Sequence, residues 1–554
     1  MIKNNLNLTI LFVLLSLNNM LIYSVETSSP KNKVSSMTSY ETVNAIPAND
    51  FLNSIGVVSA INARGENADM TTACAKYLGF RFIRGTVPDD NKTPLIYYKR
   101  LYDEANVRFA CLIGSSPDET SINKVIVGAK SLAEFGGLLS IEGANEPNNW
   151  AVTYNGVVGG GKTSTTWRPV AEMQRDLYSA VKNDPVLKDY PVWNISESGG
   201  QKDNMGLQFL TIPSTASTLM PAGTKYADYA CCHNYFNSAG LPIPQNNQTW
   251  ISADPTSACK VDGLYKNYGK TWGKSFTGYT AAQLLTLPKV TTETGVKIEG
   301  VVTEEFQALM YMSAYLAQFK NGWSYTSMYL LRDRTDESGN QSFGFYRPDY
   351  SPRQAAIYLH NLTSVLADNK SIQLPGQLSY TIANRPSTVH ELLLQKNDGT
   401  LELVVWSERY LGGSDNITVE FDKPFEVVKV YDPTIGSEAV QTLNNVSSVA
   451  LNMTNHPFII ELNPSVTSNS QISTGNIKLA KIFPNPVNNI FYLENATDLE
   501  KIEMFDFIGK NVFTLKTLHQ GVTPIIIAHL AKGSYVLRVT STDKKVESHK
   551  IIKL

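Results

Sequence analysis

Cysteine is scarce in this chain. Its 554 residues include five cysteines, with no CxxC pair and no Cys/His spacing typical of zinc sites. So small and odd a number does not indicate a disulfide framework. Cys74 and Cys111 lie in apolar runs and are expected to be buried thiols, whereas a disulfide between Cys259 and Cys231 or Cys232 stays open. We expect no metal and no organic cofactor.

An excess of charge of one sign is also missing. The chain has 48 Lys and Arg against 50 Asp and Glu, with a formal net charge of −2. A nucleic-acid partner requires positive charge concentrated against the phosphates. We therefore expect no nucleic-acid partner.

The apolar run near the N-terminus is too short for a membrane span. It extends from Leu8 to Ile22, is interrupted by two asparagines, and falls below the roughly 20 residues that cross a bilayer. A basic start, a short apolar run and then small polar residues indicate a secretory signal peptide over residues 1–24. No cysteine for lipid attachment follows closely. We expect no retained transmembrane segment.

After a polar segment, residues 25–45, short apolar runs alternate with segments of helical periodicity. This alternation is typical of parallel α/β units. Eight repeats within residues 46–369 predict a (β/α)8 TIM barrel. A doubly wound open sheet is the alternative, but it would more often carry a Gly-rich phosphate loop after its first strand. The eight predicted strands are residues 55–61, 80–84, 107–113, 138–142, 191–195, 229–235, 289–293 and 323–331.

From residue 370 the pattern changes to period two. Residues 391–395 and 401–406, joined by an Asn-Asp-Gly turn, predict a hairpin within an all-β sandwich of residues 370–463. This sandwich could bind carbohydrate, but we favour an accessory domain packed on the barrel. A Ser/Asn/Thr-rich linker, residues 464–476, precedes a last β-rich segment, residues 477–554.

The last segment contains ordered motifs. They are Ile482-Phe-Pro-Asn-Pro486, a strand from Ile502, Gly509-Lys510 and Gly533-Ser-Tyr535, followed by a lysine-rich end. They resemble the C-terminal sorting domain of the type IX secretion system of Bacteroidetes. The resemblance implies a small β-sandwich, the secretion machinery as a partner, and a protein released outside the cell or attached to its surface after crossing the periplasm and outer membrane. A small adhesive sandwich with the same turn is the alternative.

Two glutamates follow predicted barrel strands. Glu146 stands in Asn-Glu-Pro after the fourth strand, and Glu293 ends the seventh. Side chains at the C-terminal strand ends of a barrel converge on substrate, and retaining glycoside hydrolysis needs two carboxyl groups about 5 to 5.5 Å apart. We predict that these two lie within about 6 Å of each other. Glu142, inside the fourth strand, is expected to be a buried ion-pair partner.

These motifs resemble those of the clan A retaining glycoside hydrolases. The resemblance implies that Glu146 is the general acid/base, that Glu293 is the nucleophile, and that Asn145 contacts the sugar 2-hydroxyl. His233-Asn-Tyr235 resembles the His-x-Tyr pair of the clan, in which Tyr235 orients Glu293. A single glutamate at a strand end is more often a solvated carboxylate or a helix cap. The pair in the expected strands favours catalysis.

Further residues complete the predicted site. Arg84 ends the second strand and resembles the arginine of the clan near the nucleophile, where it would keep Glu293 ionised, although it could also be a salt-bridge partner below the site. Trp150 and Tyr154 are expected to stack on sugar rings. Tyr329 is a rim candidate, and it departs from the tryptophan that the clan often has on strand eight.

The sequence therefore predicts a secreted retaining glycoside hydrolase that cleaves a polysaccharide or oligosaccharide by double displacement. A non-catalytic surface carbohydrate-binding protein and an adhesin built from the β modules are the alternatives. The paired glutamates argue against both. Sugar identity, linkage and endo or exo action depend on loops whose paths the sequence does not define.

Overall fold

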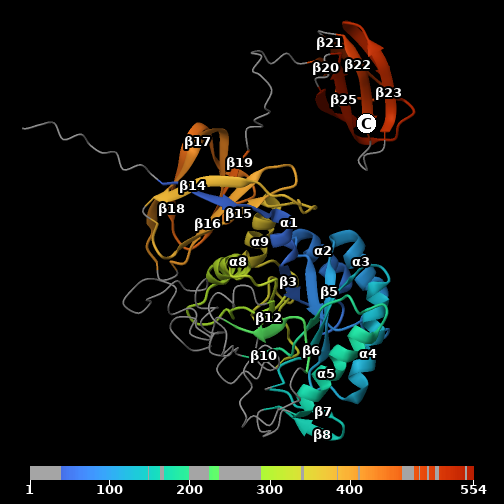
Figure 1. The fold of residues 1–554 in the computed structure, drawn as a ribbon, viewed down its shortest axis with the longest axis vertical. Helices are drawn as coiled ribbons and strands as arrows, with labels where there is room; N and C mark the ends of the chain where they lie inside the picture. The colour runs from blue at the N-terminus through green and yellow to red at the C-terminus, as the bar shows by residue number, and fades with distance from the viewer. Residues whose placement is uncertain are drawn as a thin grey trace, which may run out of the picture. The chain divides into compact units, whose positions relative to one another are not determined.

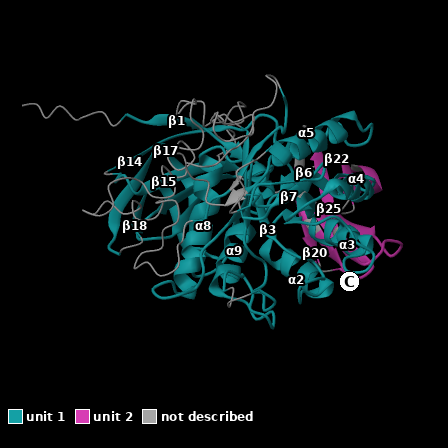
Figure 2. Ribbon diagram, turned by 90° about the horizontal axis from the view of Figure 1, so that it is seen from below, with its two compact units in different colours: residues 1–465 teal, residues 466–554 magenta. Residues whose placement is uncertain are grey.

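In the computed structural model, the described part of the chain begins at residue 39. The predicted signal peptide and linker lie outside the described residues. The chain divides into two compact units, Met1–Ser465 and Val466–Leu554 (Figure 2). The described residues are 39–147, 149–161, 168–198, 224–235, 288–337, 342–383, 385–409, 412–463, 479–483, 485, 487–495, 498–505, 511–542 and 546–554.

The first unit contains a mixed α/β fold with an eight-stranded parallel barrel that is almost completely closed. β9 pairs with β6, and β10 pairs with β11. The two short strands β9 and β10 therefore share the fifth position of the barrel, between β6 and β11. Parallel bridges from Trp193 to Tyr229 and from Asn145 to Ser196 join them to the same neighbours, and β13 pairs back with β3. In order, the strands are β3 (Ile55–Val58), β4 (Phe82–Gly85), β5 (Arg108–Gly114), β6 (Leu138–Ala144), β9 (Val192–Trp193), β10 (Glu197–Ser198), β11 (Ala230–His233), β12 (Lys289–Thr294) and β13 (Tyr325–Met328).

In the described part of the chain, a helix follows each of β3, β4, β5, β6, β12 and β13, as the sequence periodicity predicts (Figure 1). Capping residues set where they begin: the Asn67 side chain accepts from two backbone N–H groups of the first turn, and Thr303 Oγ1 accepts from Phe306 N at 3.1 Å. The described helices of this unit are α1 (Ala48–Asn53), α2 (Ala68–Leu78), α3 (Leu95–Ala105), α4 (Glu119–Ala133), α5 (Arg168–Asn183), α8 (Glu304–Lys320) and α9 (Gln354–Val365).

The barrel interior is filled by an apolar layer of side chains. Phe82, Trp193 and Tyr325 pack with ring centroids 5.3 to 6.2 Å apart, together with Cys231 and Val290. Residues two positions further along β4 and β11 point the same way because side chains alternate along a strand. Polar side chains near the C-terminal strand ends therefore lie on a closed apolar floor.

The described cysteines behave as small buried residues. Cys74 and Cys111 are free and buried, which confirms the expectation. Cys231 is also a free thiol and lies 3.2 Å from Thr292 Oγ1. Cys259 and the side chain of Cys232 lie outside the described part, so a disulfide between these two stays open.

The described secondary-structure elements of residues 370–463 are all strands, and they belong to one connected sheet, while the predicted sandwich stays a prediction. β17 is shared, because its first part pairs with β14 and its last part with β19. Two N-terminal strands, which the sequence did not predict, join the sheet through β14 and β15. The strands are β1 (Glu41–Asn44), β2 (Ile46–Pro47), β14 (Gln377–Ala383), β15 (Val389–Gln395), β16 (Leu401–Ser407), β17 (Asp415–Tyr431), β18 (Ala439–Met453) and β19 (Pro457–Leu462).

One face of this sheet packs on the barrel. Val404 and Trp406 of β16 belong to the same apolar core as α8 and α9, whereas Leu403 and Val405 belong to a second core within the sheet. Trp406 is fully buried. The sheet therefore shares an apolar core with the barrel, and its role as an accessory domain stays a prediction.

The second unit is a small all-β structure. A three-stranded and a four-stranded antiparallel sheet surround one apolar core. Among the described residues of the whole chain, no helix is both long and apolar enough to cross a membrane. The strands are β20 (Ala480–Phe483), β21 (Ile490–Asn495) and β24 (Gly521–Ile526), then β22 (Leu499–Phe505), β23 (Asn511–Leu518), β25 (Gly533–Ser541) and β26 (Val546–Lys553).

Candidate active site

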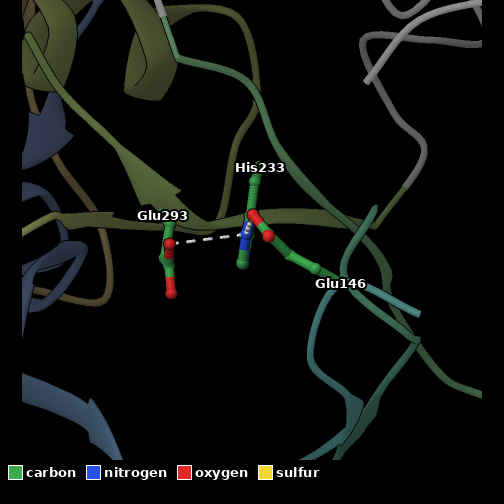
Figure 3. A group of neighbouring side chains, drawn as sticks. All are labelled: Glu146, His233 and Glu293. Atoms are coloured by element: carbon green, nitrogen blue, oxygen red, sulfur yellow. Dashed lines mark hydrogen bonds and ion pairs between the residues drawn. The ribbon is translucent and has the colours of Figure 1, made fainter. Parts of the chain in front are cut away.

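Five polar side chains meet at the C-terminal ends of the barrel strands. Arg84 comes from β4, Glu146 follows β6, His233 ends β11, Tyr235 follows it, and Glu293 lies on β12. Figure 3 shows the carboxyl groups of Glu146 and Glu293 approaching the same imidazole ring. The structure therefore brings together the residues that were predicted from separate parts of the sequence.

A β-bulge aims Glu293 into the barrel. Val290 and Thr292 already face the interior, so strict alternation would turn Glu293 outward. The pairing of β12 with β11 shifts by one residue, which sets Glu293 opposite His233. Bulges near active sites commonly re-aim a side chain in this way.

Two donors hold the Glu293 carboxylate. Arg84 Nη1 donates to Oε1 at 2.5 Å, and the Tyr235 hydroxyl donates to Oε2 at 2.7 Å. Burial and the Glu293 charge raise the pKa of Tyr235 well above its usual value, so the phenol remains a donor. The predicted contacts of Arg84 and Tyr235 with Glu293 are both present.

Glu146 adopts a strained backbone conformation. Its φ is +43°, in the left-handed region that non-glycine residues rarely occupy. Backbone bonds from Glu146 N to Ser196 O at 2.7 Å and from Trp150 N to Glu146 O at 2.9 Å hold it there. Strain of this kind costs about 1 to 3 kcal/mol and concentrates at functional sites.

Two side chains bind the Glu146 carboxyl group. His233 Nδ1 lies 2.8 Å from Oε1, and Asn149 Nδ2 donates to Oε2 at 2.9 Å. Burial raises the pKa of Glu146, but the hydrogen bond and charge of His233, together with Asn149, outweigh it and lower this pKa to about 2. Glu146 is therefore ionised in the free protein at neutral pH.

The two carboxyl groups are close. Ligand atoms of Glu146, His233 and Glu293 all lie within 4.8 Å of one another, which meets the predicted limit of about 6 Å. Such a group could also hold a metal ion. However, Arg84 and Tyr235 already donate to both oxygens of Glu293, and a guanidinium disfavours a second cation there. The donor set fits a carboxylate pair better than a metal centre.

Arg84 is held from below by Glu142. Its Nε and Nη2 donate to the two Glu142 oxygens at 3.0 and 2.7 Å, and Nη2 also reaches Asn145 Oδ1 at 2.8 Å. Glu142 is completely buried and accepts a further bond from Thr292 Oγ1 at 3.1 Å. The expectation that Glu142 is a buried ion-pair partner is confirmed. Burial alone would lower the pKa of Arg84, but Glu142 and Glu293 raise it.

A cavity of about 970 Å³ opens above these residues. Asn145, Glu146, Glu293, Tyr235 and Arg84 line its floor. The Asn145 amide is fixed, since its Nδ2 donates to Ser115 Oγ at 3.1 Å. This volume is within the range of ligand-binding clefts.

The aromatic candidates divide into two groups. Trp150 is 52% exposed and lines the cavity, and Tyr329 lines it beside Tyr235, with ring centroids 6.2 Å apart. Tyr154 is not among the described lining residues. It lies on β7 (Val152–Tyr154), which pairs with β8 (Val157–Gly159), and its hydroxyl donates to Asp176 at 2.8 Å. Tyr154 is therefore placed as a packing residue of this hairpin.

Several cavity residues were not foreseen from the sequence. Arg334 and Glu337 form an ion pair at 2.9 Å, and Glu337 accepts from the Tyr329 hydroxyl at 3.0 Å. Phe343 contacts both Tyr235 and Tyr329. These residues follow strand eight in a loop without periodicity. Only their position after a C-terminal strand end could have indicated them.

The end of the chain has a recognisable family. Residues 481–554 match the secretion system C-terminal sorting domain. This match confirms the expected sorting domain and indicates export by type IX secretion to the cell surface or the extracellular space. A search of curated proteins finds no match to the sequence.

Solved structures show distant similarity. A family 39 glycoside hydrolase from the gut symbiont Bacteroides cellulosilyticus WH2 is 15% identical over 76% of this chain and 82% of that one, with a TM-score of 0.47. CelM2, a bifunctional glucanase-xylanase from a metagenome library, is 12% identical over 76% of this chain and 99% of that one, with a TM-score of 0.44. A glucosidase from Croceicoccus marinus is 11% identical over 77% of this chain and 97% of that one, with a TM-score of 0.45. At this similarity, the reaction of this chain has to be inferred from its own site.

Proposed function

We propose that this chain is a secreted retaining glycoside hydrolase in which Glu293 is the nucleophile and Glu146 the general acid/base. One observation carries the proposal: oxygens of the two carboxyl groups lie within 4.8 Å at the floor of a cavity at the C-terminal strand ends. Retaining enzymes hold this pair about 5 to 5.5 Å apart, and inverting enzymes about 6.5 to 9.5 Å. The shorter separation leaves no room for a water molecule between sugar and base.

In the first step, Glu293 attacks the anomeric carbon while the glycosidic bond breaks. The leaving oxygen takes the proton of Glu146, and a glycosyl ester forms on Glu293. In the second step, a water molecule gives a proton to Glu146. The water oxygen attacks the same carbon and releases Glu293 from the ester. Two displacements on one carbon retain the anomeric configuration.

The contacts of Glu293 suit a nucleophile. Arg84 and Tyr235 donate to different oxygens, so the carboxylate keeps one orientation without blocking both lone pairs of each oxygen. Asn145, fixed by Arg84 and Ser115, is proposed to contact the sugar 2-hydroxyl. Such a bond assists catalysis if it strengthens in the oxocarbenium-like transition state.

The acid role requires that substrate change the protonation of Glu146. Its pKa of about 2 in the free protein suits the base of the second step, not the acid of the first. Burial is already the largest single influence on this pKa and raises it, and a sugar that fills the cavity removes the remaining water. In the glycosyl ester Glu293 is neutral, so Glu146 loses a negative neighbour and its pKa falls again.

The sorting domain supports export of the chain, so the proposed reaction would act on glycans outside the cell. The cavity of about 970 Å³, with Trp150 on its wall, suits several sugar rings. We therefore propose a polysaccharide or oligosaccharide substrate.

The test is a panel of polysaccharides with the wild-type chain, Glu146→Gln and Glu293→Gln. Glu305→Gln is the matched control, because Glu305 is an exposed carboxylate at the start of α8 and does not line the cavity. We expect new reducing ends from the wild type and the control only, and proton NMR of the first product should show a retained anomer. An inverted anomer, or full activity in Glu293→Gln, would contradict the proposal.

A further inference from the structure

A charged group lies beneath the proposed catalytic pair and has no place in the two displacement steps. Glu142 is completely buried, so it touches neither substrate nor solvent. It nevertheless makes two hydrogen bonds to Arg84, at 3.0 and 2.7 Å, and the same guanidinium donates to Glu293 at 2.5 Å. One cation is therefore shared between a buried carboxylate and the proposed nucleophile.

We propose that Glu142 is a positioning residue that acts through Arg84 and sets how strongly this cation binds Glu293. The proposal rests on the proposed function, because it concerns the reactivity of Glu293 as a nucleophile. It has a geometric part and an electrostatic part, which predict different effects of substitution.

The geometric part follows from how Arg84 is held. Glu142 engages Nε and Nη2, which form one edge of the planar guanidinium. A two-point contact on one edge fixes both the position and the plane of the group, and this directs Nη1 at Glu293 Oε1. With a shorter side chain at position 142, Arg84 would keep a partner but lose this alignment.

The electrostatic part depends on how many carboxylates share the positive charge of Arg84. The single Arg84 guanidinium is shared between two carboxylates, Glu142 and Glu293. Without the Glu142 charge, Glu293 would be the one carboxylate bonded directly to Arg84, and Arg84 would bind it more strongly. The negative charge of Glu293 disappears as it attacks the sugar, so stronger binding of that charge lowers the energy of the reactant and raises the barrier.

Among the described groups around Glu142, none supplies the negative charge that its substitution would remove. Cys111 and Cys231 are close enough to Glu142 to interact with it electrostatically, and burial raises the pKa of both thiols, so they are neutral. Thr292 donates a hydrogen bond without charge. The described titratable groups that face Glu293 are Arg84, Glu146, Cys231, His233, Tyr235 and Tyr329.

The experiment measures kcat/KM against pH for the full chain on an activated aryl glycoside, whose leaving group needs no proton. Glu142→Gln keeps the shape and removes the charge, and we expect a loss of about 10- to 100-fold with the acidic limb moved to lower pH by about one unit. Glu142→Asp keeps the charge and shortens the side chain, so kcat/KM should fall while the acidic limb stays. Thr292→Val is the matched control, because it removes one hydrogen bond to Glu142 without a change of charge and should leave the acidic limb in place.

An acidic limb of Glu142→Gln that coincides with that of the wild type, or one that moves equally in Thr292→Val, would overturn the proposal. If Glu142→Gln does not fold, Glu142→Asp decides, because wild-type kcat/KM in that variant excludes positioning through Arg84. Failure of the proposed function looks different, since the wild type would then release no aryl group or Glu293→Ala would release it at the same rate.

Discussion

Removal of the Arg84 side chain should be one of the most destabilising single changes in the barrel. Arg84 is 3% exposed and Glu142 is fully buried, and together they make two charge-assisted hydrogen bonds of 2.7 and 3.0 Å. In Arg84→Met, Glu142 would stay buried without a counter-charge. Breaking a buried pair from one side costs about 3 to 5 kcal/mol of the free energy of unfolding.

The double variant Arg84→Met/Glu142→Leu tests the cause. It replaces the buried pair by apolar side chains of similar volume, which is often neutral or stabilising relative to the pair. We therefore expect it to recover at least about 2 kcal/mol of the loss seen in Arg84→Met. If Arg84→Met were destabilising only because packing volume is lost, the additional change Glu142→Leu would instead make the double variant less stable than Arg84→Met.

Urea unfolding followed by tryptophan fluorescence measures this difference. All seven tryptophans precede residue 466, so the signal reports on the first unit and not on the sorting domain. A cost below about 1 kcal/mol for Arg84→Met, or a double variant less stable than the single one, would refute the reasoning.

Three further predictions concern other parts of the chain. Trp150→Ala should raise KM about 10-fold with little change in kcat if this half-exposed ring stacks on a sugar away from the bond that breaks, and a loss confined to kcat would contradict this. Burial, opposed by Lys396, raises the pKa of Glu402 to about 7. The stability contributed by its protonated form is therefore present below its ordinary pKa of 4.5 and is lost as pH rises through 7. Glu402→Gln should be more stable than the wild type at pH 8 and equal to it below pH 4.5 in urea unfolding. A chain without residues 466–554 should hydrolyse glycans but not be exported, and a folded truncation without activity would contradict this.

The sequence predicted the barrel because short apolar runs alternate with segments of helical periodicity in eight repeats. It did not predict how the fifth strand divides into β9 and β10, since this depends on pairing with neighbours far away in sequence. The pairing of β1 and β2 with the accessory sheet is equally non-local. Strict alternation would have turned Glu293 away from the site, and only the pairing shift in β12 explains its direction.

The candidate site was likewise predicted only in part from the sequence. Arg84, Glu146, His233, Tyr235 and Glu293 were predicted because they stand at strand ends in recognisable motifs. The path of loops is not encoded in a period, so the place of Tyr154 in a hairpin and the contributions of Ser115, Asn149, Arg334, Glu337 and Phe343 had to come from the structure. Backbone strain at Glu146 is likewise a product of its contacts with Ser196 and Trp150.

The most direct test of the account assigns each glutamate its role by azide rescue. In Glu293→Ala the nucleophile is missing, so azide should attack the sugar in its place and give a glycosyl azide of inverted configuration. In Glu146→Ala the glycosyl ester should still form from an activated aryl glycoside and then stall, and azide should release a product of retained configuration. NMR of the two products gives the answer: inversion for Glu293→Ala with retention for Glu146→Ala is the predicted result, and the opposite assignment, or full activity of either variant without azide, would contradict the account.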